Sequence, residues 1–304
     1  MNNTNLAIIA IVIVVPLVSF VVYASDSTIQ QNTANSDLQV MTSFYPLYEF
    51  AQKVGQDKVD VILLVPMGVE PHDWEPTIQD VQRMQKADLI VINGLGFESW
   101  VGHLSEINFH GNIIDTSTGI KTDMIDSHED SSNHSHTSGD PHIWLNPVLA
   151  KIQVQNIADA FSKHDPQNDK FYQLNAENYK NELDLLDTKI RNELSSCSRD
   201  FIAFHDAFSY FSQEYGLNQH TIIPSNNPHA EPTARTLEDV INTAKELDLK
   251  IIFTEETADP RTAEIISNAI NGRVLVLSPI EIGDDGDYIS RMTENLNNLK
   301  EALC

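Results

Sequence analysis

Basic residues are scarce in this 304-residue chain, which has 19 Lys and Arg residues against 44 Asp and Glu residues and a formal net charge of −25. Such an acidic surface repels the phosphates of nucleic acids and the head groups of anionic lipids, which argues against a nucleic-acid-binding role. The acidic balance attracts cations weakly everywhere, but it does not by itself make a selective site. The length is too great for one ordinary core and favours two domains of typical size.

Cysteine is nearly absent, because the whole chain contains only Cys197 and Cys304. In an oxidising compartment an isolated pair is best explained as one disulfide, and two free thiols are the alternative. The disulfide would close a loop of about 107 residues. On the chain-entropy model, closing a loop of that length stabilises a protein by roughly 4–5 kcal/mol.

Lys and Arg are also missing from the first five residues, which precede a nearly unbroken apolar stretch from Leu6 to Ala24. A stretch of this length spans a bilayer or forms a long signal-peptide core. No Cys directly follows this stretch, which argues against a lipid anchor of bacterial type. We expect residues 1–24 to be a signal peptide or a retained membrane anchor and residues 25–37 to be a polar linker. The folded part is therefore expected to work outside the cytoplasm.

Eight short runs rich in Val and Ile alternate with helical patterns, and these runs are LQVMTSFYP, KVDVILLVP, DLIVING, NIIDTS, DFIAFH, HTIIPS, KIIFTEE and RVLVLSP. Apolar strands between helices indicate parallel sheets that are covered on both faces. We predict an α/β fold of two lobes, each a mainly parallel sheet flanked by helices, over residues 38–146 and 199–304. Residues 147–198 are predicted to be helical, with one long helix that joins the lobes.

Two helix starts are suggested by their first residues. Asn146 and Pro147 are suited to the N-cap and first turn of the helix that follows the first lobe. Asp206 is placed to cap the helix that follows the run DFIAFH.

One segment does not belong to the alternation of strands and helices. Residues 121–140, KTDMIDSHEDSSNHSHTSGD, are polar, have no apolar period and contain His128, His134 and His136. We interpret them as an acidic, His-bearing loop. A weak metal-collecting tract and a plain solvated insert remain as alternatives.

Two Pro-framed stretches each present a histidine beside carboxylates, and these are GVEPHDWEPT with His72 and GDPHIWLNP with His142. His72 follows one predicted strand, while His205 and Glu255 end two others. Ligands of open parallel sheets bind beyond the carboxyl ends of the strands. Because two of these residues come from each half of the chain, facing lobes would bring them into one cleft.

Three neutral imidazoles and one oxygen form the ligand set of a tetrahedral zinc site. Imidazole suits Zn²⁺, whereas a larger share of carboxylates would favour Mn²⁺. We expect Glu255 to accept a hydrogen bond from the N–H of a ligand imidazole without binding the metal itself. Taken singly, His72 or His142 is as readily a capping or surface residue as a ligand. The inference therefore depends on their convergence.

The stretches GVEPHDWEPT, DPHIWLNP, AFHDAFSYFSQEYGL, FTEETADPR and DYISRMTENLNNLKEAL follow one another between residue 38 and the C-terminus. Together they resemble the zinc- and manganese-binding proteins of ABC transporters, a solute-binding family that includes the zinc-uptake periplasmic proteins. The resemblance implies two α/β lobes joined by a long helix, with metal held between them by His72, His142 and His205. The His-bearing loop before DPHIW resembles the zinc-specific members in particular.

The chain departs from this family in its last strand. Some members supply a ligand Asp at the position where this chain has Ser278. A water molecule, or Glu70 from the loop that carries His72, is then the expected fourth ligand.

These observations predict a monomeric, extracytoplasmic protein that binds Zn²⁺ with high affinity and delivers it to the permease of an ABC transporter. Mn²⁺ is the less favoured cargo. One alternative is a zinc-dependent hydrolase, since three histidines and a water also describe catalytic zinc. The chain contains no HExxH motif, which favours a binding protein over an enzyme. The other alternative is an extracellular zinc buffer or adhesin that works without a transporter.

Overall fold

The computed structural model describes residues 38–104, 111–121, 139–223 and 231–304. The apolar stretch and linker predicted for residues 1–37 lie outside these ranges, as do His128, His134 and His136 of the His-bearing loop. Within the described ranges, no helix has both the length and the apolar character needed to cross a membrane. The residues from Asp37 to Cys304 form one compact unit.

The first sheet contains four parallel strands in the order β2-β1-β3-β4. In chain order its elements are β1 (Leu38–Thr42), α2 (Tyr45–Gly55), β2 (Val59–Leu63), α3 (Ile78–Met84), β3 (Leu89–Ile92), α4 (Val101–Leu104) and β4 (Asn112–Asp115). A crossover connection after each of β1, β2 and β3 lets the next strand run in the same direction. The carboxyl ends of all four strands therefore lie together, and the loop after β2 carries His72.

The second sheet repeats this arrangement with the order β6-β5-β7-β8, again all parallel. Its elements are β5 (Asp200–His205), α7 (Ser209–Tyr215), β6 (Asn218–Ile223), α8 (Ala234–Glu246), β7 (Ile251–Thr254), α9 (Pro260–Ala269), β8 (Arg273–Val276) and α10 (Tyr288–Leu303). The predicted α/β fold of two parallel sheets flanked by helices is confirmed.

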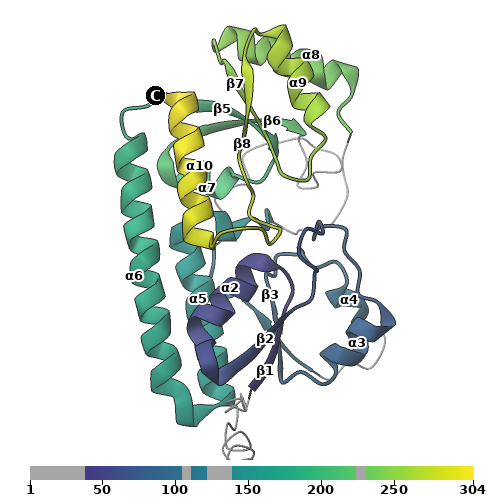
Figure 1. Ribbon diagram of the computed structural model, residues 1–304, viewed down its shortest axis with the longest axis vertical. Coiled ribbons are helices and arrows are strands. Elements are labelled where there is room, and N and C mark those ends of the chain that lie inside the picture. Colours follow the sequence, from purple (N-terminus) through teal and green to yellow (C-terminus); the bar gives the residue numbers. More distant parts are fainter. Residues whose placement is uncertain (1–37, 105–110, 122–138, 224–230) are drawn as a thin grey trace, which may run out of the picture. The chain divides into compact units, whose positions relative to one another are not determined.

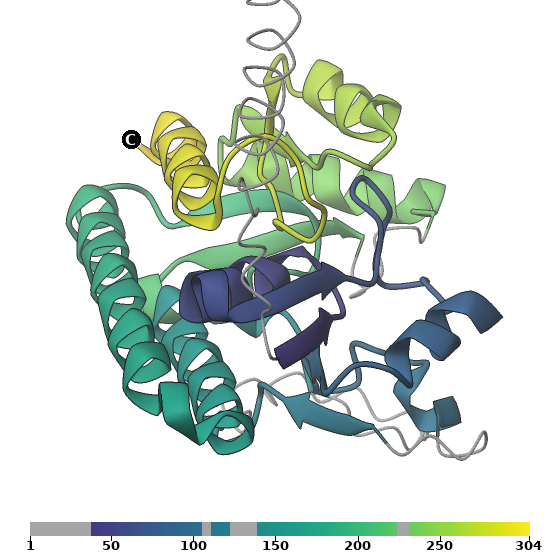
Figure 2. The same ribbon diagram turned by 60° about the horizontal axis from the view of Figure 1, so that its bottom comes forward.

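Two helices connect the sheets. Helix α5 (Pro147–His164) begins as predicted, because the Asn146 side chain accepts a hydrogen bond from the Val148 N–H at 2.8 Å. Helix α6 (Asp169–Leu194) has 26 residues, which corresponds to roughly 39 Å at the rise of an α-helix. In Figures 1 and 2 it runs along one side of both sheets, with α5 and α10 packed beside it.

The largest group of buried apolar side chains extends through both lobes. It includes Phe50 of α2, Ile157 of α5, Leu186 of α6, Phe253 of β7 and Leu299 of α10. Two smaller groups cover the opposite faces of the sheets, one beneath α3 and α4 and the other beneath α8 and α9. Because the main core is shared, the two sheets and the helices between them stabilise one another.

Helix α7 begins differently from the prediction. It starts at Ser209 after Phe208, and no side chain caps its first turn. Asp206 instead accepts hydrogen bonds from the Ser209 hydroxyl at 2.8 Å and from the Gln219 amide. The expected cap was therefore wrong, because the carboxylate lies within reach of two side-chain donors.

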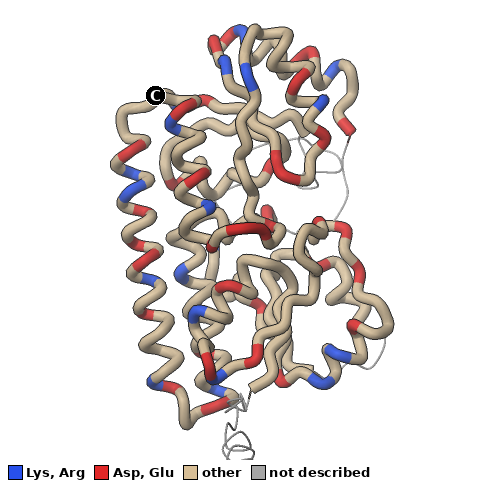
Figure 3. Tube along the Cα trace, in the orientation of Figure 1, with Lys and Arg blue, Asp and Glu red and all other residues tan. Residues whose placement is uncertain are grey.

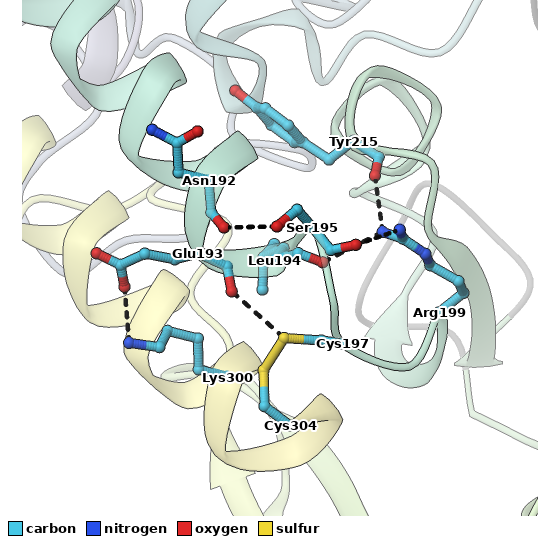
Figure 4. Close-up of a disulfide and its surroundings, with 9 residues drawn as sticks. All are labelled: Asn192, Glu193, Leu194, Ser195, Cys197, Arg199, Tyr215, Lys300 and Cys304. Atoms are coloured by element: carbon cyan, nitrogen blue, oxygen red, sulfur yellow. Dashed lines mark hydrogen bonds and ion pairs between the residues drawn. A yellow bond between two sulfur atoms is a disulfide. The ribbon is translucent and has the colours of Figure 1, made fainter.

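The predicted disulfide between Cys197 and Cys304 is present, with the two Cα atoms 4.7 Å apart (Figure 4). It joins the third residue after α6 to the end of α10. Beside it the Ser198 N–H donates to the Leu303 carbonyl at 2.9 Å, and Lys300 pairs with Glu193 at 2.7 Å. The end of α10 is thus fastened to the end of the connecting helix.

Replacing both cysteines with serine should lower the free energy of unfolding by about 2–5 kcal/mol, because the unfolded chain regains the freedom that the closed loop removed. Urea unfolding followed by circular dichroism measures this change. Ser195→Ala is a suitable control, since the exposed Ser195 hydroxyl binds only the Asn192 carbonyl beside the same disulfide. Unfolding curves that coincide for the parent and the double serine variant would contradict the expectation.

Candidate metal centre

Four side chains from both halves of the chain meet between the sheets. His72 lies on the loop after β2, His142 directly precedes the short helix before α5, and His205 ends β5. Glu281 lies on the loop after β8. Their candidate ligand atoms all lie within 4.8 Å of one another. The structure thus brings the three predicted histidines together and adds a carboxylate that sequence reasoning had not selected.

The three imidazoles direct their Nε2 atoms at a single carboxylate oxygen. Glu281 Oε1 lies 3.1 Å from the Nε2 atom of His72, 3.3 Å from that of His142 and 3.7 Å from that of His205. The Nε2 atoms of His142 and His205 are 3.3 Å apart. Ligands held at about 2.0–2.1 Å around a tetrahedral Zn²⁺ lie about 3.3 Å from one another. Three of these four distances are therefore close to the spacing around a tetrahedral ion, and the fourth, 3.7 Å, is somewhat longer.

Two carboxylates orient the buried imidazoles. Asp140 Oδ1 lies 2.7 Å from His142 Nδ1, and Glu255 Oε1 lies 2.7 Å from His205 Nδ1. Each of these oxygens also accepts the backbone N–H of the same histidine, at 3.0 Å and 3.2 Å respectively. A carboxylate in this position holds the proton on Nδ1 and leaves Nε2 free to bind a metal. Glu255 thus has the contact that its predicted role requires.

Glu70 lies beside this group rather than within it. Its Oε1 atom accepts the backbone N–H of His72 at 3.2 Å, and its Oε2 atom accepts the Thr257 hydroxyl at 3.4 Å. The contact with Thr257 connects the loop after β2 with the loop after β7, across the two lobes. Burial and the nearby Glu281 carboxylate raise the pKa of Glu70 to about 8.

Glu281 was missed because the family resemblance placed the expected acid at Ser278, two residues after β8. The carboxylate comes three residues later, after Ile280, whose φ of 58° is left-handed. The stretch Glu281 to Asp287 resembles an acidic surface loop, since it also contains Asp284 and Asp285. The available signal was that Glu281 alone among these acids stands between two isoleucines.

Charge is concentrated and buried at this site, whereas elsewhere acidic and basic residues are scattered over both lobes and along α6 (Figure 3). Glu281 is 2% exposed, and His142 and His205 are fully buried. Burial lowers the pKa of His142, but Asp140 and Glu281 outweigh it and raise the pKa to about 8. Burial likewise opposes a charge on His205, yet Glu255 and Glu281 hold its pKa well above the usual value.

The same interactions act on Glu281 with the opposite sign. Burial raises the pKa of Glu281, but His72 and the other two imidazoles outweigh it and hold the pKa well below the ordinary value. Without metal, the cluster therefore favours an ionised Glu281 carboxylate beside protonated His142 and His205. A bound cation would displace these protons and supply the positive charge in their place.

Metal binding at this site should weaken as the pH falls below about 8, which is the raised pKa of His142. The ion binds neutral imidazole, so protons held by His142 and His205 compete with it. Each imidazole that must lose a proton weakens the apparent affinity by about tenfold per pH unit below its pKa.

Competition titrations against a chromophoric chelator, with the chelator's own protonation subtracted, measure this dependence. The metal-free protein alone, titrated by NMR of its imidazole protons, serves as the control for the pKa values. An affinity that stays constant from about pH 8 to pH 6 would contradict competition at these histidines.

A family model described as the periplasmic zinc-uptake complex component A, ZnuA, matches residues 40–302. The high-affinity zinc uptake system protein ZnuA of Bacillus subtilis (strain 168) is 37% identical over 281 residues, which are 88% of this chain and 88% of that protein. The zinc-binding lipoprotein AdcA of Streptococcus pneumoniae serotype 4 is 32% identical over 288 residues. That alignment covers 90% of this chain but only 57% of AdcA, which is the longer protein.

The structure is also similar to a crystal structure of the Zn(II)-bound ZnuA-like domain of Streptococcus pneumoniae AdcA. The TM-score is 0.73 at 31% sequence identity, and the match covers 87% of this chain and 98% of that domain. The similarity therefore extends over both lobes and the helices that connect them.

Proposed function

Since this chain belongs to the family of periplasmic zinc-uptake complex component A, we propose that it captures Zn²⁺ outside the cytoplasm and delivers it to the permease of an ABC transporter. The observation that carries the proposal is the cluster of His72, His142, His205 and Glu281, whose ligand atoms face one another at tetrahedral spacing. Zinc is the cargo of this site, and Mn²⁺ is less favoured by three imidazoles.

The four residues of the cluster are the proposed zinc ligands, with Glu281 in the fourth position. Asp140 and Glu255 fix the two fully buried imidazoles through Nδ1. Glu70, which the sequence suggested as the fourth ligand, is proposed to hold the loop of His72 through the backbone N–H and through Thr257. The lobes that supply these residues are taken as residues 38–146 and 199–304, joined by the helical residues 147–198.

A capture role suits this ligand set better than hydrolysis does. Catalytic zinc sites keep one coordination position open for water or substrate, whereas sites with four protein ligands are closed. Here a fourth protein ligand lies among the histidines, and Glu281 is only 2% exposed. We therefore propose a solute-binding protein that is not an enzyme, with a permease as partner. Residues 1–24 would hold it at the membrane or direct its export.

Replacing His72, His142 or His205 with alanine should weaken zinc binding by more than about 100-fold, which exceeds the usual effect of removing a residue that only orients a ligand. At a free zinc concentration about a thousand times the Kd, the parent should gain about 4 kcal/mol of stability, and each variant should lose most of it. Isothermal titration and thermal melting with and without zinc measure the two effects. His103→Ala and His164→Ala are matched controls, because both side chains are exposed away from the cluster. A His205→Ala variant that binds zinc as tightly as the parent would contradict the proposed function.

The choice between Glu281 and Glu70 as the fourth ligand is tested by two glutamine variants. Glu281→Gln should weaken zinc binding more than Glu70→Gln does, because only the Glu281 carboxylate lies against all three Nε2 atoms. Glu255→Gln should weaken binding by about 10–100-fold, as expected for a residue that orients a ligand. If Glu70→Gln has the largest effect of the three, Glu70 rather than Glu281 completes the site.

A further inference from the structure

The turn that carries Glu281 is held by a buried arginine from another element. Arg291 lies on α10 and is 5% exposed. Its guanidinium donates to the Ser278 hydroxyl at 2.8 Å and to the Ile282 carbonyl at 2.5 Å. These two contacts lie on either side of Glu281 in the chain. One rigid planar group therefore spans the turn that presents the carboxylate.

The same guanidinium reaches a second segment of the metal centre. It pairs with Glu256 at 2.9 Å. Glu256 follows Glu255, which holds the imidazole of His205. Arg291 thus connects the end of β7 to the turn after β8, and so fixes the distance between the residues that present His205 and Glu281.

The backbone of the turn needs such support. Ile280 has a φ of 58°, a left-handed conformation that β-branched residues rarely adopt. Backbone outliers of this kind persist only where the surrounding contacts over-determine them. Asn295, one helical turn after Arg291, exchanges hydrogen bonds with the Ser278 backbone at 2.7 Å and 2.8 Å. The Trp144 indole donates to the Pro279 carbonyl at 2.7 Å.

We propose that Arg291 is a positioning residue for the metal site, acting through Glu281. This inference rests on the proposed function, because it assigns the metal-binding carboxylate to Glu281. Arg291 does not bind the metal. It holds the turn Ser278–Ile282 so that the Glu281 carboxylate stays among the three imidazoles. Ser278 serves in this chain as a partner of Arg291.

Lysine cannot replace arginine in this role. A guanidinium presents several N–H donors in a fixed plane, whereas a lysine ammonium is a single point charge on a flexible stem. Arg291→Lys therefore keeps the charge that Glu256 requires but cannot hold Ser278, Ile282 and Glu256 at once. The variant should shift the turn without replacing any of the proposed ligand residues.

The experiment compares the parent with Arg291→Lys, Ser278→Ala and the control Arg199→Lys. Arg199 is a matched control, because its guanidinium likewise has three hydrogen-bond partners, which are the backbone carbonyls of Leu194, Ser195 and Tyr215 beside the disulfide (Figure 4). For each protein, zinc affinity is measured by competition with a chelator. The visible spectrum of the Co²⁺-loaded protein reports ligand geometry, and metal-free melting reports folding.

Arg291→Lys should bind zinc about 10–100-fold more weakly than the parent, the range expected when a residue that orients a ligand is lost. Its Co²⁺ spectrum should change in shape, because the carboxylate no longer sits at its tetrahedral position. Ser278→Ala should change both readouts in the same direction by less. Arg199→Lys should keep the parent's affinity and spectrum, whatever its effect on melting.

A double-variant cycle shows whether Arg291 acts through Glu281. In the Glu281→Gln background, adding Arg291→Lys should cost no further zinc affinity, since the carboxylate it positions is gone. Parental affinity and a parental Co²⁺ spectrum in Arg291→Lys would overturn the inference while leaving the proposed function intact. An affinity loss of equal size with and without Glu281 would also overturn it. A parent protein that binds no zinc tightly would instead overturn the proposed function, and the inference with it.

Discussion

A fully buried carboxylate must be neutralised where it lies, and this constraint governs the arrangement around Glu281. Moving an unpaired ion out of water is so unfavourable that buried charges are found paired, hydrogen-bonded or bound to metals. Here three imidazoles face the Glu281 carboxylate at 3.1–3.7 Å. Either protons on the histidines or a divalent cation can balance its charge. In the proposed role, the site would bind metal by exchanging the positive charge of protons for that of the cation, and its affinity would then depend on pH.

The constraint also explains why the two lobes share a core. Because His72 and His142 come from one half and His205 and Glu281 from the other, the cluster exists only while both sheets keep their relative positions. Helix α10 is central to that arrangement, since it packs along α6 and carries Arg291 and Asn295 against the Glu281 turn. The disulfide fastens the far end of α10 to the segment that follows α6. Elements distant from the metal centre thus maintain its geometry.

Much of the fold follows from local patterns, and much of the site does not. Alternating Val- and Ile-rich runs were enough to predict the eight strands found in the described part of the chain, and the Asn146 cap required only two neighbouring residues. The rule that ligands gather at strand ends selected His72 and His205. Glu281 was not predicted as a site residue, because its position depends on the left-handed Ile280 and on Arg291, ten residues further along the chain. The prediction that Asp206 caps α7 was wrong for a similar reason, since Gln219 from β6 supplies a competing donor. Long-range side-chain contacts decided both cases.

The preference of such a site for zinc follows from the number of ligands and their spacing more than from their identity. For a given set of nitrogen and oxygen ligands, Mn²⁺ binds most weakly of the common first-row divalent ions, so zinc has the advantage before geometry is considered. Mn²⁺ also favours six oxygen-rich ligands, whereas this cluster offers four groups at tetrahedral spacing. His142 and His205 are fully buried, so additional water ligands would have to displace packed side chains. If Glu281 is the fourth ligand, as proposed, this packing would disfavour larger coordination shells, and the contacts that hold Glu281 in place would contribute to selectivity as well as to affinity.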